Sequence, residues 1–205
     1  MTIRMMICGL VATALAHTAL AADPGAGKAL YAPCAACHGA DGAGNPALNS
    51  PALAGQSADY LARQIAHFQS GVRGSDPRDT YGRQMQGMAA TLAGPDAIAN
   101  VVAFIGTLPA PVTETVEHDV RNGEVQYNAA CGACHGPTAG GNDSLNSPNL
   151  AILDGAYLRR QHQAFKDGVR GSHPDDKYGP QMQMMATMLS SEKDLDDVIG
   201  FILAQ

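Results

Sequence analysis

The sequence predicts an all-α protein built from two tandem copies of one small domain. Apolar residues recur at helical spacing in several segments, and almost no segment alternates apolar and polar side chains as a half-buried strand does. A long series of residues also recurs at one constant offset along the chain, which indicates an internal duplication.

The duplication has an offset of 97 positions, as from Cys34 to Cys131, without insertion or deletion from there to the last helix. The pairs at this offset include His38 and His135, Pro51 and Pro148, Tyr60 and Tyr157, Gln64 and Gln161, Phe68 and Phe165, Met85 and Met182, and Phe104 and Phe201. Solenoid repeats are shorter and more numerous, so two copies of this size predict two globular domains.

Each copy is expected to begin with a helix, an irregular loop rich in Gly, Asn and Pro, and a second helix. These elements are predicted over about 28–36, 39–55 and 57–70 in the first copy, and over about 124–133, 136–155 and 156–167 in the second. The glycines Gly71 and Gly168 are expected to end the second helices.

The last helix of each copy carries an apolar stripe that marks one buried face. The stripe consists of Ile98, Val101, Val102 and Ile105 in the first copy, and of Leu195, Val198, Ile199 and Ile202 in the second. Ser191, with Asp194 three residues later, predicts a capped start for the second of these helices.

The chain is expected to divide into four parts. Arg4, the apolar run over 5–16 and the small residues before Ala22 predict a secretory signal peptide over 1–21, cleaved near Ala21. The run is shorter than the roughly 20 apolar residues of a spanning helix, which disfavours a membrane anchor. Two prolines and several β-branched residues predict an extended linker over 109–117. The domains are therefore predicted at 22–108 and 118–205, in a protein exported to the periplasm.

Charge narrows the choice of partners. The formal net charge is −6, and loss of Arg4 with the signal would make it −7. Nucleic-acid binding calls for clustered basic residues, so this balance argues against it and favours a partner with a positive docking face.

Two C-x-x-C-H motifs carry the chemistry: Cys34-Ala-Ala-Cys37-His38 and Cys131-Gly-Ala-Cys134-His135. This motif is the attachment signature of c-type haem, in which both cysteines form thioethers and the histidine binds the iron. Disulfides are the usual first interpretation of cysteines in an exported protein. A thioredoxin-like motif requires a βαβ context, and a zinc site requires further histidines at ligand spacing, neither of which the sequence offers. Two covalently bound haem c groups are therefore predicted.

Methionine is the expected second axial ligand of each iron. Met85 and Met88, with Met182 and Met185 at the same offset, lie about fifty residues after each motif and before the last helix. Methionine ligation raises the reduction potential and closes the sixth position of the iron. One methionine of each pair is expected to bind iron and the other to fill the core, while Met184 and Met188 add alternatives in the second copy.

The chain after residue 21 resembles the diheme cytochromes c of the cytochrome c4 family, which consist of tandem class I cytochrome c domains. Three stretches carry the resemblance: Asn-Ser-Pro-Ala-Leu-Ala-Gly-Gln (49–56), Tyr-Leu-Ala-Arg-Gln-Ile (60–65), and the Met-x-x-Met-Ala pattern from Met85. The resemblance favours Met85 and Met182 as ligands. The first copy departs from the family with Ala-Gly-Pro (93–95), where a Ser-Asp helix start is usual.

The resemblance also implies roles for residues around the haems. The carbonyls of Pro51 and Pro148 are expected to accept the Nδ1 proton of the ligand histidines. Arg73 and Arg170 are either partners of haem propionates or solvated loop arginines. The histidines without a counterpart in the other copy are expected at the surface; these are His67, His118, His162 and His173.

Three functions fit this sequence. The resemblance implies periplasmic electron transfer from a quinol-oxidising complex towards a terminal oxidase or another cytochrome, with membrane association only through such partners. An electron-accepting subunit of a periplasmic dehydrogenase would have the same haem-site residues. A diheme redox enzyme is disfavoured, because no cysteine remains as an unusual ligand and the matched methionines single out neither haem.

Overall fold

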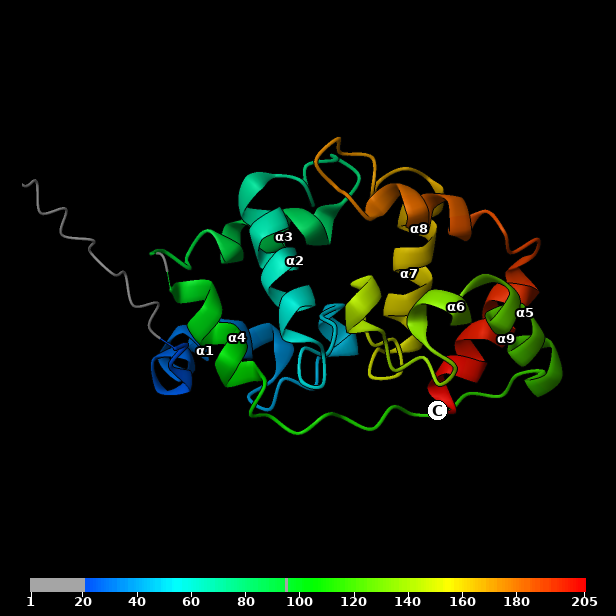
Figure 1. Cartoon of the computed structure of the whole chain (residues 1–205), viewed down its shortest axis with the longest axis horizontal. Helices are drawn as coiled ribbons and strands as arrows, with labels where there is room; N and C mark the ends of the chain where they lie inside the picture. The colour runs from blue at the N-terminus through cyan, green and yellow to red at the C-terminus, as the bar shows by residue number, and fades with distance from the viewer. Residues whose placement is uncertain (1–20, 95) are drawn as a thin grey trace, which may run out of the picture.

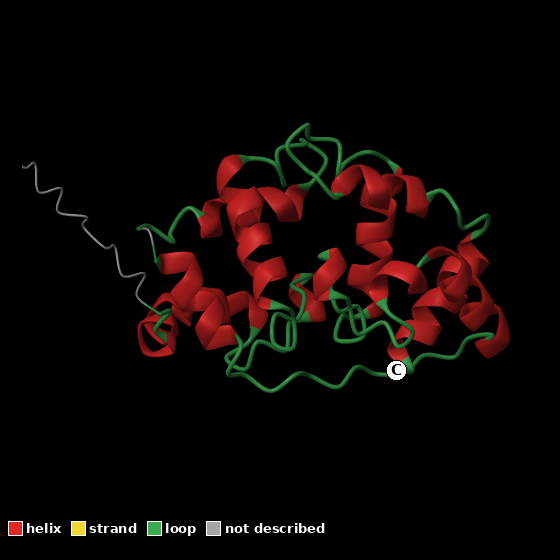
Figure 2. Cartoon of the chain, viewed as in Figure 1, coloured by secondary structure: helices red, strands yellow, loops and turns green. Residues whose placement is uncertain are grey.

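The computed structural model describes residues 21–94 and 96–205. Within these ranges the chain forms helices, turns and two isolated bridges, and no strand (Figure 2). The predicted all-α class is confirmed. The predicted signal peptide lies outside the described residues except for Ala21.

The first domain contains α1 (Pro24–His38), α2 (Ala58–Ser70), α3 (Thr80–Ala89) and α4 (Ala97–Ile105). The second contains α5 (Val120–Ala130), α6 (Gly132–His135), α7 (Gly155–Lys166), α8 (Gly179–Ala186) and α9 (Glu192–Leu203). Each loop after a C-x-x-C-H motif includes a short 3-10 turn, η1 (Pro46–Leu48) or η2 (Asp143–Leu145). In both domains the first helix packs against the last (Figure 1).

One extra residue precedes the cysteines of the second domain. Tyr31 and Tyr127 donate equivalent hydrogen bonds, each of 2.7 Å, to the carbonyls of Gly39 and Gly136, although the tyrosines are only 96 positions apart. α1 runs without a break through its cysteines, whereas Cys131 interrupts the second domain between α5 and α6. One inserted residue would rotate the following part of a continuous helix by about 100°. The break at Cys131 therefore lets the second motif keep the orientation that the first motif has in α1. The prediction of one continuous helix over 124–133 is therefore wrong.

The contact between first and last helices depends on glycine. A Cβ atom at Gly27 would overlap the carbonyl oxygen of Asn100, and one at Gly123 would overlap that of Asp197. The backbones therefore approach more closely than any larger residue allows. The Asn100 and Asp197 side chains accept the backbone N–H groups of the helix-capping residues Asp23 (2.7 Å) and Asp119 (3.0 Å).

The apolar stripes of the last helices form the centre of two separate cores. Val101 is 1% exposed and Val198 is 3% exposed, and both pack among the apolar side chains of their own domain. The Ser191 hydroxyl accepts the N–H of Asp194 at 3.1 Å. The predicted buried stripe and the predicted cap are therefore confirmed.

α3 and α8 were not predicted as helices. Gly82 and Gly87 lower the helix propensity of α3, and Pro180 lies in the first turn of α8, where proline is tolerated. The Asp79 carboxylate accepts the N–H of Gly82 at 2.8 Å, and that of Asp176 accepts the N–H of Gly179 at 2.9 Å. These two helices carry the candidate methionine ligands.

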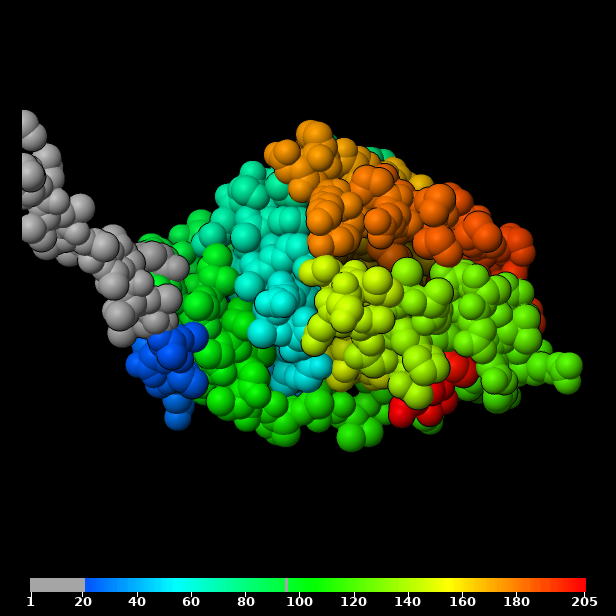
Figure 3. All heavy atoms as spheres, in the orientation of Figure 1, coloured from blue at the N-terminus to red at the C-terminus, as the bar shows by residue number. Residues whose placement is uncertain are grey.

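The two domains meet along a junction between α2 and α7, which lie in the middle of the molecule (Figure 1). On the face drawn in Figure 3, atoms of the second domain meet those of the first along a continuous seam. The segment from α4 to α5 has no helix and runs along one edge of the molecule (Figure 1). Thr113 fastens it to the second domain by hydrogen bonds to the carbonyls of Ala151 (3.2 Å) and Leu203 (3.4 Å). Among the described residues, no helix combines the length and apolar character needed to cross a bilayer.

Candidate haem sites

The histidine of each C-x-x-C-H motif ends a helix and is buried. His38 and His135 are each 5% exposed. Nδ1 of His38 donates to the carbonyl of Pro51 at 2.8 Å, and Nδ1 of His135 donates to that of Pro148 at 3.0 Å. The predicted role of both prolines is confirmed. Because Nδ1 is engaged, Nε2 is the ring nitrogen left for a metal.

Burial also sets the protonation state of these histidines. Desolvation lowers the pKa of His38 and of His135, against the opposite effect of the hydrogen bond to the proline carbonyl. The neutral imidazole that results is the form that binds a metal.

The four cysteines of the described residues form no disulfide with one another. Burial raises the pKa of Cys34, and burial followed by the nearby Cys134 raises that of Cys131 to about 11. Redox-active C-x-x-C motifs depend on a lowered thiol pKa. These thiols are therefore unlike those of a disulfide oxidoreductase.

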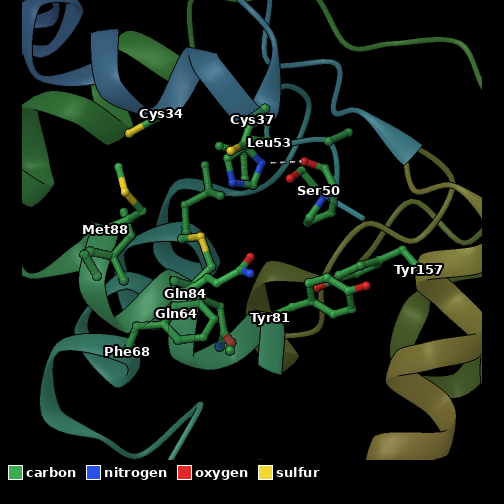
Figure 4. Close-up of a pocket in the computed structure, with 18 of the residues that line it drawn as sticks. Cys34, Cys37, Ser50, Leu53, Gln64, Phe68, Tyr81, Gln84, Met88 and Tyr157 are labelled. Atoms are coloured by element: carbon green, nitrogen blue, oxygen red, sulfur yellow. Dashed lines mark hydrogen bonds between the residues drawn. The ribbon is translucent and has the colours of Figure 1, made fainter. Parts of the chain in front are cut away.

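A cavity in the first domain joins the motif to the candidate methionines. Cys34, Cys37 and His38 line one side, and Met85 and Met88 line it from α3. Figure 4 shows both cysteines on the helix above the cavity, Met88 below it and Tyr157 of the second domain at its edge. The space between these residues is about 1390 Å³, part of it open to solvent.

Exposure narrows the choice of methionines in the second domain. Met184 and Met188 are 62% and 60% exposed, whereas Met182 and Met185 are partly buried like Met85 and Met88. Each domain therefore presents two candidates three residues apart on one helix, and Met184 and Met188 are surface residues.

Arg73 and Arg170 lie at the junction between the domains. Arg73 donates to Gln64 Oε1 (2.7 Å) in its own domain, and to Tyr157 Oη (3.1 Å) and Gln161 Oε1 (3.0 Å) in the other. Arg170 makes the same three contacts with the residues at the matching positions, at 2.7, 3.2 and 3.0 Å. Arg73 is only 9% exposed, so the interpretation as a solvated loop arginine is wrong for it.

Two more arginines lie at the same junction. Arg63 binds the side chain (3.2 Å) and carbonyl (2.8 Å) of Asn146, and Arg160 binds those of Asn49, both at 2.9 Å. Within the described residues, neither these two arginines nor Arg73 and Arg170 form an ion pair. Nε of Arg73 and Nε of Arg160 are buried with no acceptor among those residues, and both arginines line the cavity.

The cavity residues fit a haem. The porphyrin needs apolar walls, two thiols for attachment and ligands for its iron, and all of these line the cavity. Its propionates need donors, which Arg73 and Arg160 supply where the cavity reaches the second domain. A buried guanidinium without a counter-ion is costly, so a carboxylate at this edge would be stabilising. The residues present therefore suit an amphipathic, acidic haem.

Not every histidine without a counterpart is a surface residue. The His118 ring contacts Gly200 on α9, and its Nδ1 lies 2.9 Å from the Val116 carbonyl oxygen. Both ring nitrogens of His162 are buried. The expectation of an ordinary surface position is therefore wrong for His162, a partly buried residue of α7.

Comparison with known proteins gives one consistent family. Residues 25–109 and 120–205 each match the family model of cytochrome c. The chain is 32% identical to cytochrome c4 of Pseudomonas aeruginosa, over 93% of this chain and 91% of that protein. It is 34% identical to a thiosulfate dehydrogenase electron acceptor of Stutzerimonas stutzeri, over 87% and 86%.

A solved structure supports the same assignment. Reduced recombinant cytochrome c4 from Pseudomonas stutzeri superposes with a TM-score of 0.72 at 30% identity, covering 89% of this chain and 98% of that one. Each matched domain has its own C-x-x-C-H motif, so the protein carries two covalently bound haem c groups. The chain belongs to the cytochrome c family, as a diheme electron carrier similar to cytochrome c4 and not an enzyme.

Proposed function

We propose that this chain is a periplasmic cytochrome that passes single electrons between respiratory-chain partners through two haems with histidine and methionine ligands. The proposed iron ligands are His38 and Met85 in the first domain, and His135 and Met182 in the second. The observation that carries the proposal is the cavity lined by a buried imidazole, with Nδ1 already engaged, and by thioethers from α3.

The haem, when bound, supplies an iron that alternates between the ferrous and ferric states. The protein contributes fixed ligands and a largely apolar surrounding. The carbonyl of Pro51 holds the His38 ring, and Met85 is carried by a helix whose start is capped by Asp79. Ligands held on packed helices need little rearrangement when the iron changes charge, which favours fast electron transfer.

The location and the domain limits are part of the proposal. Residues 1–21 are assigned to a cleaved signal peptide, 22–108 and 118–205 to the two haem domains, and 109–117 to the linker. The proposed donor is a quinol-oxidising complex, and the proposed acceptor is a terminal oxidase or another cytochrome.

A second candidate is an electron-accepting subunit of a periplasmic dehydrogenase. The similarity to the thiosulfate dehydrogenase electron acceptor favours it, because that relative matches over 87% of this chain. Reduction of the purified protein by a quinol-oxidising membrane fraction supports the respiratory carrier. Reduction only by a co-purifying dehydrogenase and its substrate supports the subunit.

Ligand substitution tests the haem sites. In protein expressed with haem-maturation machinery, Met85→Ala should keep two covalent haems per chain. The first haem should lose its methionine-ligand spectrum and become high-spin or misligated, with a lower reduction potential. Met88→Ala is the matched control and should leave both spectra intact. The reverse pattern would assign the ligand to Met88, and acid-extracted protein with fewer than two haems per chain would refute the proposal.

A further inference from the structure

One of the differences between the two haem sites introduces an ionisable side chain. Most side chains lining the first cavity have an identical or similar counterpart 97 positions later. Ile65 lines the cavity and packs against the first core, but its counterpart is His162. Among the lining residues, this is the one exchange of an apolar residue for an ionisable one.

His162 on α7 occupies the position in the second domain that Ile65 on α2 occupies in the first. α2 packs against α3 and α4 in the first domain, and α7 packs against α8 and α9 in the second. The offset is unbroken through these helices, and their flanking residues match, including Gln64 with Gln161 and Phe68 with Phe165. His162 therefore has the position in the second domain that the cavity-lining Ile65 has in the first.

Packing alone does not explain a histidine here. Both ring nitrogens are buried, and neither has a hydrogen-bond partner among the residues that the structure describes. A buried polar group without a partner is destabilising relative to an apolar side chain, and isoleucine fills the matching site in the first domain. The surrounding charges are Lys166 on the same helix, Glu192 on α9 and Arg159. Burial, assisted by the two cations, lowers the pKa of His162, so the ring is neutral near pH 7.

We propose that His162 makes the two haems inequivalent by lowering the reduction potential of the second haem below that of the first. This inference rests on the proposed function. The ferric haem carries one more positive charge than the ferrous haem, so a more polar surrounding stabilises the ferric form. Burial, polarity and hydrogen bonding around a haem are the means by which proteins tune its potential. The imidazole dipole supplies this polarity in the second site, where Ile65 supplies none in the first.

A reciprocal exchange in the full-length, haem-loaded protein tests this role. The potential of each haem is followed by spectroelectrochemistry, with the haems assigned by the NMR signals of their methyl groups. His162→Ile should raise the potential of the second haem towards that of the first and leave the first unchanged. Ile65→His should lower the potential of the first haem alone. His162→Gln, which stays polar without titrating near neutral pH, should keep most of the difference.

The outcomes separate this inference from the proposed function. If the wild type carries two methionine-ligated haems but both exchanges leave both potentials unmoved, the role of His162 is refuted while the carrier function stands. A rise in the second potential in both His162→Ile and His162→Gln would also overturn it, because polarity would then not be the cause. If His162→Ile fails to load haem, Ile65→His decides alone. Loss of methionine ligation in the wild type would refute the proposed function itself.

Discussion

Single hydrogen bonds decide which atoms of the haem-site residues are free to bind. The Pro51 carbonyl occupies Nδ1 of His38, and the Pro148 carbonyl does the same for His135. Tyr31 and Tyr127 hold the carbonyl of the glycine that follows each histidine. Each proximal histidine is therefore held at its ring, and the carbonyl of the residue after it is held by a tyrosine.

His162 should make stability depend on pH. Its folded pKa is lowered, chiefly by burial, so the unfolded chain, with a pKa of about 6.5, takes up the proton first as the pH falls. The contribution of the neutral ring to stability is therefore complete above about pH 6.5 and is lost as the pH drops towards the folded pKa. His162→Ile should lose less stability than the wild type on acidification.

Chemical denaturation of both haem-loaded proteins between about pH 5 and pH 7.5 measures this effect. Two curves that stay parallel over that range would show that His162 takes no part in it.

The sequence predicted the site residues whose spacing is constant. The motif histidines, the prolines and both methionine pairs share one offset, and the structure brings the first-domain set to one cavity. The tyrosine contacts were missed because one extra residue changes their offset to 96. His162 was taken as a surface residue because no histidine matches it in the first copy, although its counterpart at the constant offset is the apolar Ile65.

At the scale of elements, the contact between α1 and α4 leaves no space for a side chain larger than glycine at position 27. Gly27→Ala would push its Cβ against the carbonyl of Asn100, and overpacking of this kind costs about 1–3 kcal/mol. The free energy of unfolding of the haem-loaded protein should fall by that amount in chemical denaturation.

Gly87→Ala on α3 is the matched control. A Cβ there has no other atom within 4 Å, so alanine should be neutral or stabilise the helix by up to about 1 kcal/mol. Equal effects of the two substitutions would show that the close approach of α1 and α4 does not limit stability.

Strongly periodic helices were predictable, and weakly periodic ones were not. The stripe of α4 and α9 gave their positions, and Gly71, with φ of 78°, ends α2 as expected. α3 and α8 were missed because glycine reduces the propensity of α3 and α8 is short, and the contacts of Asp79 and Asp176 with the starts of these helices are visible only in the structure. Tertiary packing overrides propensity in these two helices.

For the whole molecule, the junction between the domains should depend on its buried arginines. Arg73→Met removes three hydrogen bonds of a charged group, to Gln64, Tyr157 and Gln161. Arg170 still donates to the two glutamines, whereas Tyr157 loses its arginine donor. We expect a loss of about 3 kcal/mol in the free energy of unfolding. Exposed Arg83 makes no ion pair in the part of the chain described, so Arg83→Met should change stability by less than about 0.5 kcal/mol.

Arg73 and Arg170 share Gln64 and Gln161 as acceptors, so their effects should not be additive. In denaturation experiments, the double variant Arg73→Met with Arg170→Met should lose more stability than the sum of the two single variants, because only the double variant leaves both glutamines without an arginine donor. Strict additivity would indicate that the two arginines act separately.

The sequence predicted two domains but not how they meet. The matched arginines, tyrosines and glutamines were visible as repeats, yet their interdomain contacts depend on the relative placement of α2 and α7. No local pattern encodes that placement. The sequence therefore left Arg73 as either a propionate partner or a solvated loop arginine, whereas the structure shows it in a loop that contacts the other domain.

Each polar contact that Arg63 and Arg73 make across the junction has an equivalent contact, made by Arg160 and Arg170 with the residues at the matching positions. A surface that contains both halves of each such contact is self-complementary, as in a two-fold symmetric homodimer. One such domain on its own would already possess everything needed to pair with a second copy of itself. The fused chain then behaves as a tethered dimer, in which the linker raises the effective concentration of two halves that recognise each other. Cutting the linker should therefore leave them associated.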